Sequence, residues 1–293
     1  MSTATLTNNG AAAGYEPTRT LTFWTEFVRQ WRRRRTQLAL GFMVLLPIII
    51  LIAFQIGGDD DDDGGSRNGT FSSIIDVATA GGLNFALFTL FVSSSFLLVV
   101  IFALFHGDTV ASEASWGSLR YLLAVPVPRG RLLGIKLSVA LTYSLLAVVV
   151  LVGTALGLGT LRYGWHALQS GISADLPASE GLLRLLGIAG YLSLTLLVVA
   201  GIAFLLSVLT DAPLGAVGGA VLLFILSSIL DQITALGELR NFLPTHFARS
   251  YLGLLASPIQ FDGMVKGAIS AICYAAIFWG IAFWRFTRKD VTS

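Results

Sequence analysis

The stretch Leu185–Leu209, LLGIAGYLSLTLLVVAGIAFLLSVL, decides the fold because it runs for 25 residues without an acidic or basic side chain. A helix rises about 1.5 Å per residue, so roughly 20 apolar residues cross a hydrocarbon core about 30 Å thick. Five further uncharged stretches approach or exceed that length: Gln37–Ile56, Asn84–Phe105, Leu137–Leu158, Leu214–Leu230 and Gly267–Trp284. We therefore predict an all-α integral membrane protein with six transmembrane helices.

The composition of the chain agrees with this fold class. Of its 293 residues, 55% are hydrophobic and only 12% are charged, whereas a soluble domain has about 25% charged residues. So little polar surface excludes an ordinary cytosolic enzyme, a disordered chain and a nucleic-acid-binding module. The one cysteine, Cys273, excludes an intrachain disulfide framework and a multi-cysteine metal site.

The distribution of charge predicts the orientation of the six helices. Basic residues are enriched on the cytoplasmic side of a membrane protein, and an even number of spans places both termini on one side. With the termini inside, 13 of the 19 basic and 6 of the 17 acidic residues face the cytoplasm, giving about +7 inside and −5 outside. The predicted topology is N-in and C-in, with the six-helix domain over residues 37–290.

The segment 20–36, which follows a tail at 1–19 of disordered composition, predicts an amphipathic interfacial helix. Phe23, Phe27 and Trp31 recur every four residues, and the four arginines Arg32–Arg35, beginning with Arg32 and Arg33, follow them. Such a helix lies along the inner membrane surface, with the aromatic side chains in the lipid and the arginines at the phosphates. A stretch of basic residues that only sets the topology is the alternative.

Three loops carry further patterns. Asp59–Asp63 match the start of an EF-hand loop, but position twelve is Thr70 instead of Glu, so a solvated acidic turn is the better interpretation. The cytoplasmic loop 106–136 predicts a helix that begins at Thr109 or Val110 and ends before Pro126. Its apolar side would either dock a soluble partner or pack back on the bundle. In the outer loop 232–266, short helices are expected to dip toward the membrane.

Signatures of catalysis are missing from the sequence. There is no phosphate-binding loop, zinc-protease motif or nucleophile elbow, and the three histidines form no obvious cluster. No catalytic or metal site is predicted. Asp231, at the outer end of the fifth span, is either a proton relay or a solvated helix end. Residues that could line a substrate path or simply pack helices together are Ser94, Ser95, Tyr143, Gly215, Gly219 and Ser227.

The cytoplasmic loop resembles a known family. It contains Glu113, Gly117-Ser118-Leu119, Leu122-Leu123, Pro126-Val127, Arg129 and Lys136. This pattern, with six spans and an amphipathic helix before them, is similar to the type-2 export permeases of ATP-binding-cassette (ABC) transporters. Phe242-Leu243-Pro244 also resembles the outer helices of that family.

The resemblance implies a function and its partners. The chain would be the permease subunit of an ATP-driven exporter in a bacterial cell membrane, pairing with a second permease copy or paralogue and two separate ATPase subunits. ATP and Mg²⁺ would bind those ATPases, so no cofactor is expected in this chain. The residues implied to contact the ATPase are Glu113, Trp116, Gly117, Arg120, Leu122, Pro126, Arg129 and Lys136. The alternative function is a secondary carrier or channel. An intramembrane enzyme is disfavoured, because the sequence has no paired catalytic residues.

Overall fold

The computed structural model describes residues 21–58, 69–115, 128–169 and 175–288. This part of the chain is helical and contains no strand; Leu168 and Leu176 form one isolated β-bridge. The elements are α1 (Phe23–Trp31), α2 (Arg34–Gly58), α3 (Gly69–Thr79), α4 (Gly82–Ser95), α5 (Leu97–Ser115), α7 (Arg129–Tyr163), α8 (Ala178–Thr195), α9 (Leu197–Leu209), α10 (Pro213–Asp231), η3 (Thr234–Phe242), η4 (Ser250–Leu255) and α11 (Asp262–Arg288).

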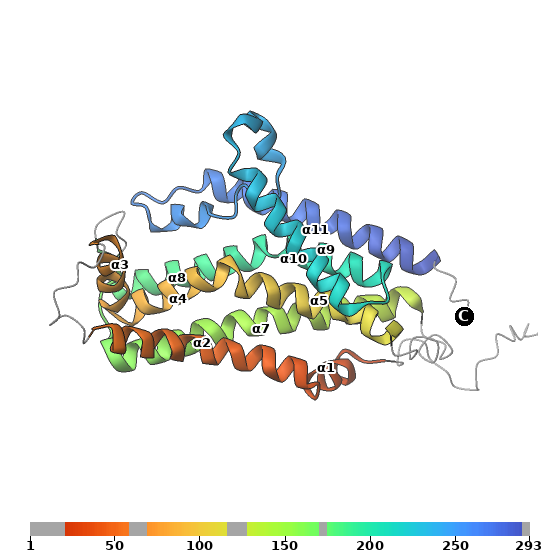
Figure 1. Ribbon diagram of the computed structural model, residues 1–293, viewed down its shortest axis with the longest axis horizontal. Coiled ribbons are helices and arrows are strands. Elements are labelled where there is room, and N and C mark those ends of the chain that lie inside the picture. The colour runs from red at the N-terminus through yellow and green to blue at the C-terminus, as the bar shows by residue number, and fades with distance from the viewer. Residues whose placement is uncertain (1–20, 59–68, 116–127, 170–174, 289–293) are drawn as a thin grey trace, which may run out of the picture.

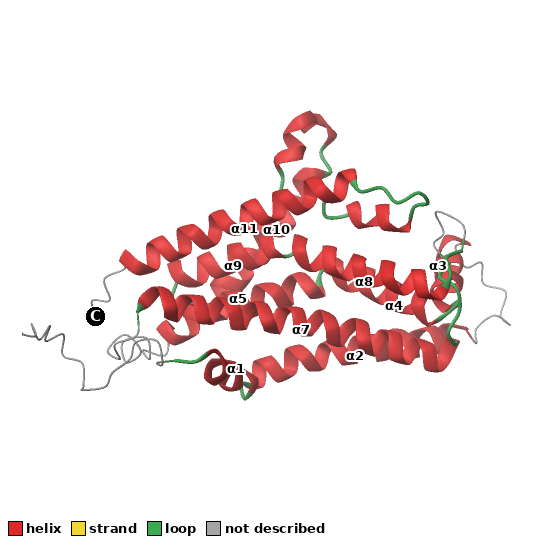
Figure 2. Ribbon diagram, turned by 180° about the vertical axis from the view of Figure 1, so that it is seen from behind, coloured by secondary structure: helices red, strands yellow, loops and turns green. Residues whose placement is uncertain are grey.

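Six helical segments among the described residues are long and apolar enough to cross a membrane, which agrees with the predicted fold class. They are Arg34–Ile56, Leu97–Ser115, Arg129–Tyr163, Ala178–Leu209, Pro213–Asp231 and Asp262–Arg288. Most lie side by side along the long axis of the molecule, and α10 is inclined to them (Figure 1). The end of α11 lies at the same end of the bundle as α1, and α3 lies at the opposite end (Figure 2).

The core lies among α4, α5, α7, α8 and α9, and α10 and α11 pack against α9. Its largest fully buried side chains include Tyr143, Phe85, Phe102, Phe105 and Phe204. By contrast, α2, α10 and α11 expose rows of large apolar residues, such as Leu38, Leu222 and Ile269. Exposed apolar faces of this extent are unfavourable in water, and they fit a hydrocarbon environment.

Two of the long helical segments of the bundle are interrupted, each near the middle of one of the uncharged stretches of sequence. Phe96 leaves the helical region with φ −143° and ψ −55°, which separates α4 from α5. Leu196 separates α8 from α9 with a smaller departure, φ −70° and ψ −10°. The second predicted span is therefore wrong as one helix over Asn84–Phe105: α4 and α5 share it, and α5 continues to Ser115.

Several other boundaries differ from the predictions. The helix predicted to start at Thr109 or Val110 has no boundary there, because α5 is continuous through both residues. The sequence patterns also missed α3. The short outer helices are present as the 3₁₀ segments η3 and η4. The acidic residues Asp59–Asp63 lie outside the described residues.

Candidate functional site

Helix α1 is held against the bundle by aromatic contacts. Thr22 caps its first turn, accepting a hydrogen bond from the backbone N–H of Thr25 at 3.3 Å. The ring of Phe27 stacks on that of Tyr143 from α7, with the ring centroids 4.7 Å apart. The Tyr143 hydroxyl also donates to the Phe27 carbonyl oxygen at 2.7 Å. Phe27 therefore packs on protein, whereas Phe23 and Trp31 keep exposed surfaces.

The most distinctive site is a group of seven charged side chains that we call the charge cluster. It joins α1, α2, α5 and α7 at one end of the bundle, and its members are Glu26, Arg29, Arg33, Arg35, Asp108, Glu113 and Lys136. Four of its residues, Glu26, Asp108, Glu113 and Lys136, are at most 4% exposed. Buried charges require close partners because their desolvation costs several kcal/mol each.

Lys136 lies at the centre of this cluster. Its Nζ is 2.6 Å from Glu113 Oε1 and 3.4 Å from Glu26 Oε1. Arg29 bridges the same two carboxylates, with its Nη2 2.7 Å from Glu26 Oε1 and in contact with Glu113. Burial alone would raise the pKa of Glu26, but Lys136 and Arg29 outweigh that effect and hold the pKa below its usual value of 4.5.

The other half of the cluster connects the start of α2 to α5. Arg35 forms an ion pair with Asp108, and Arg33 Nη1 lies 3.4 Å from the other oxygen of the same carboxylate. Arg32 is exposed. Of the arginines predicted to follow the interfacial aromatic residues, therefore, Arg33 and Arg35 turn toward the protein and Arg32 faces outward.

Helices on the far side of α5 fix the position of its charged end. The hydroxyl oxygen of Ser207 in α9 accepts hydrogen bonds from the backbone N–H groups of Val110 and Ala111, at 2.9 and 3.0 Å. At Gly107, a Cβ atom would lie 2.9 Å from Val217 Cγ2 of α10. This close approach of α5 and α10 requires glycine, and it leaves Asp108 and Glu113 little freedom to move.

The structure places the residues expected at an ATPase interface in three different ways. Glu113 and Lys136 are internal, each with a side chain only 3% exposed. Arg129 is half-buried, and its Nη1 donates to the Thr287 carbonyl oxygen at 3.2 Å. Trp116, Gly117, Arg120, Leu122 and Pro126 lie outside the described residues. The sequence patterns did not predict that Glu26, Arg29, Arg35 and Asp108 belong to the charge cluster. Glu26 could have been noticed, because it is an acidic residue within a strongly basic segment.

A polar cavity of about 230 Å³ forms where the two helix interruptions meet. Ser94 and Ser95 line it from the end of α4, and Thr195 and Leu196 line it from the break between α8 and α9. The end of α10 and the segment Pro244–Tyr251 complete its walls. Ser94 and Ser95 beside the first break and Leu196 at the second line this cavity, and irregular backbone at membrane depth is tolerated where it lines a polar cavity.

The cavity contains an acid–histidine pair. The Nδ1 atom of His246 is 2.5 Å from Asp231 Oδ1, and Arg240 Nε approaches the same oxygen at 3.6 Å. Asp231 is thus half-buried and paired with a histidine that the sequence patterns had left apart. Among the described residues, no group of three potential ligands could hold a metal ion.

The chemistry of the cavity follows from its hydrogen bonds. Ser94 and Thr195 donate their hydroxyl protons to carbonyl oxygens of their own helices, at 2.8 and 3.0 Å. Thr195, and Ser228, which donates to Phe224, therefore keep lone pairs for a ligand, whereas the Ser94 hydroxyl also contacts the Tyr251 hydroxyl. The volume corresponds to about eight water molecules. The site can accept hydrogen bonds from water or from one small polar group.

The predicted path residues divide between this cavity and other places. Ser94 and Ser95 line it, and Ser227 bonds at 2.8 Å to Thr245, which also lines it. Tyr143 lies under α1 instead. A Cβ atom at Gly219 would lie 3.0 Å from Leu206 Cδ1 of α9, and one at Gly215 would lie 3.6 Å from the Cβ of Ala212, three residues earlier.

Comparisons with known proteins add a family without an assigned activity. No curated protein matches the chain. A family with the description "Protein of unknown function (DUF2705)" matches residues 49–292, which include α5, α7 and the polar cavity. Because the match covers well over half of the sequence, the chain belongs to the DUF2705 family.

Proposed function

We propose that this protein is the permease subunit of an ATP-driven exporter of the ABC type-2 class, located in a bacterial cell membrane with both termini in the cytoplasm. It works with a second permease, identical or paralogous, and with two separate ATPase subunits that bind ATP and Mg²⁺. The charge cluster lies at the cytoplasmic end, and the polar cavity lies toward the outer end.

One observation carries this proposal: the ion pair between Glu113 and Lys136 connects the two ends of the loop that resembles an ATPase-coupling element. Glu113 lies in the last turn of α5, and Lys136 lies two turns into α7. The same carboxylate is joined to α1 through Arg29. A displacement of the loop or of α1 is therefore passed to α5 and α7 together, which is the coupling that a motor on a separate chain requires.

The polar cavity supports transport in a second way. A chain of apolar helices has no structural need for two interruptions that converge on one polar cavity. The backbone leaves helical geometry at Phe96, whereas it remains hydrogen-bonded on both sides of Leu196. Discontinuous helices that line a polar site are a recurring feature of transporters. In this proposal the cavity lies on the path of the cargo, or of its polar part.

The experiment is co-purification of the full chain with the ATPase encoded beside it. We expect wild-type protein to retain that ATPase and to raise its hydrolysis rate. Arg120→Glu, in the loop, is expected to lower both, whereas the matched change Arg162→Glu at the other end of α7 is expected to change neither. Glu113→Lys is unsuitable as a docking variant, because Glu113 is buried and the change would disrupt the cluster. An ATPase that is neither retained nor stimulated by wild-type protein refutes the proposal.

A secondary carrier is the second candidate, and the Asp231–His246 pair in the cavity favours it. The purified chain would be reconstituted in liposomes with an enclosed pH-sensitive dye and no ATPase. The exporter proposal predicts no proton flux above that of empty liposomes. A flux that wild-type protein supports and Asp231→Asn abolishes would decide for the carrier.

A further inference from the structure

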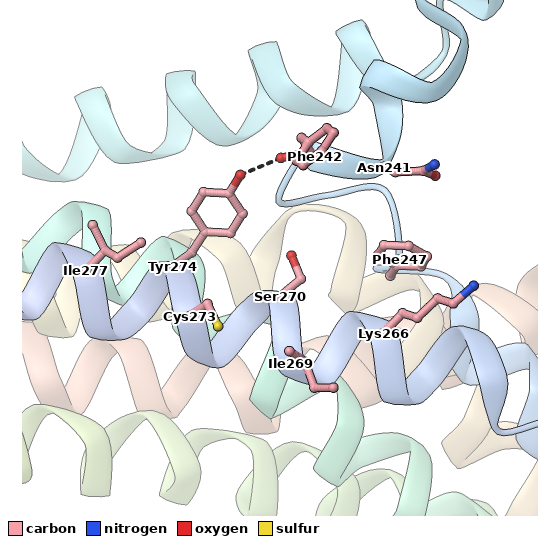
Figure 3. A pocket seen from close by; sticks show the side chains of 9 residues that line it. All are labelled: Asn241, Phe242, Phe247, Lys266, Ile269, Ser270, Cys273, Tyr274 and Ile277. Atoms are coloured by element: carbon pink, nitrogen blue, oxygen red, sulfur yellow. Dashed lines mark hydrogen bonds between the residues drawn. The ribbon is translucent and has the colours of Figure 1, made fainter.

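A second and larger hollow lies on the outside of the bundle, between α11 and the segment that precedes it. We call it the α11 groove; its volume is about 630 Å³. Its floor is one face of α11 from Lys266 to Ile277, and its other wall comes from Asn241, Phe242 and Phe247 (Figure 3). It is separate from the polar cavity, with which it shares no lining residue.

The walls of the α11 groove are fixed by hydrogen bonds. The hydroxyl of Tyr274 in α11 donates to the carbonyl oxygen of Phe242, as the dashed line in Figure 3 marks. The hydroxyl of Tyr191 in α8 donates to the carbonyl oxygen of Phe247 at 2.7 Å. The backbone of both aromatic residues is thus held in place by hydrogen bonds from the bundle.

The polarity of the α11 groove changes along its length. Lys266 and Asn241 lie at one end, Ser270 follows, and the far end is formed by Ile277 and the ring of Tyr274 (Figure 3). From Lys266 to Ile277, α11 rises about 16 Å, because each residue adds about 1.5 Å. That distance is about half of a 30 Å hydrocarbon core. The groove therefore runs from a charged end to an apolar end over the depth of one leaflet.

The charged end has an unmatched positive charge. In the part of the chain that the structure describes, Lys266 makes no ion pair, and its side chain is exposed. Asn241 uses one amide hydrogen to bond Glu238 at 2.6 Å, which leaves the second hydrogen for a ligand. Glu238 itself does not line the groove. An ammonium group beside an amide donor is complementary to phosphoryl oxygens.

From this order of charge and apolar surface we propose that the α11 groove binds a phospholipid with an anionic headgroup, taken from the leaflet at the Lys266 end. Its phosphoryl oxygens contact Lys266 Nζ and the Asn241 amide, and an acyl chain lies along Ile269, Cys273 and Ile277. The inference requires only that α11 crosses a membrane, so it stands or falls independently of the ATPase.

The chain supplies its own probe for this site, since Cys273 is its one cysteine, is exposed and lies in the groove. The full-length protein in detergent is titrated with phosphatidylglycerol or phosphatidylcholine, and the rate of maleimide labelling is measured. We expect the anionic lipid to protect Cys273 at about fivefold lower concentration than the zwitterionic lipid, the preference that one lysine near a lipid surface gives.

Two variants make the test specific. Lys266→Ala is expected to remove the preference, so that both lipids protect equally, and Lys266→Arg is expected to keep it. Arg249→Ala, which removes an exposed positive charge at the polar cavity, is the control and should leave the preference unchanged. Equal protection of wild-type protein by the two lipids overturns the proposal. Protection that follows protein concentration instead of lipid would assign the groove to a second copy of the chain, and also overturns it.

Discussion

Replacing Lys136 by methionine isolates the contribution of the charge cluster. Lys136 is 3% exposed, and its ammonium group contacts two carboxylates, at 2.6 Å for Glu113 and 3.4 Å for Glu26. The variant keeps the length and apolar stem of the side chain but leaves both carboxylates with Arg29 as their shared partner. Removing one member of a buried ion pair costs about 3–5 kcal/mol, chiefly because the remaining charge stays desolvated.

The assay is thermal unfolding of the full chain in detergent, with tryptophan fluorescence as the signal. A change of 1 kcal/mol shifts the Tm by about 2–4 °C in domains of comparable size, so we expect Lys136→Met to lower the Tm by about 10 °C. The same change at exposed Lys266, in detergent without added phospholipid, should shift it by less than about 2 °C. Adding Glu113→Gln to Lys136→Met should recover part of the loss, because the uncompensated carboxylate is removed.

The reasoning fails on either of two results. A Tm for Lys136→Met equal to that of Lys266→Met would mean that the cluster contributes nothing measurable. Strictly additive losses in the double variant would mean that Lys136 and Glu113 do not interact in the folded protein, despite their separation of 2.6 Å.

Three further predictions address α1 and the helix crossings. Lys136 and Arg29 lower the pKa of Glu26 in the folded protein, so the stabilising effect of the Glu26 carboxylate is complete above the usual pKa of 4.5 and is lost as the pH falls below it. Glu26→Gln should therefore reduce the fall of the Tm at acidic pH in a plot of Tm against pH. Phe27→Ala should cost about 2 kcal/mol, less than the ~3–5 kcal/mol for a fully buried phenylalanine because Phe27 is only partly buried, and should free α1 for cleavage by added protease, as followed on gels. Gly82→Val should lower the Tm by several degrees, since a Cβ there would lie 2.5 Å from an α7 side chain, whereas Gly153→Val, with no atom within 4 Å, should not.

Uncharged length predicts the six candidate membrane-spanning segments found among the described residues, but not where they begin and end. The second span was expected to stop at Phe105 because charged residues follow, yet α5 continues through Asp108 and Glu113, whose partners lie on other helices. The helix α8 similarly begins before Arg184, whose guanidinium donates to the Leu254 and Ala256 carbonyl oxygens at 2.8 and 2.9 Å. A rule based on one stretch of sequence cannot predict a buried charged residue whose partner lies in a distant segment.

For the candidate sites, the sequence predicted the segments that carry them better than the contacts between those segments. The basic segment before α2 and the loop around Glu113 both stand out in the sequence, but no local pattern shows that Glu113 and Lys136 point inward to each other. The polar cavity was harder still to predict from the sequence, because it forms only where two helix breaks and a loop meet. The run Ser93–Ser95 marks one break, since such hydroxyls compete for helix carbonyls, while Leu196 carries no comparable signal.

The charge cluster also has a consequence for how the chain is assembled during its synthesis. Three arginines and three carboxylates of the cluster precede Lys136 in the sequence, so they form a balanced set before α7 has been made. Lys136 follows Glu113 by 23 residues, an interval of a few seconds at typical rates of translation. During that interval the acids of α5 can enter the bundle already paired with N-terminal arginines. The lysine then arrives as the last component and joins α7 to helices that were made before it.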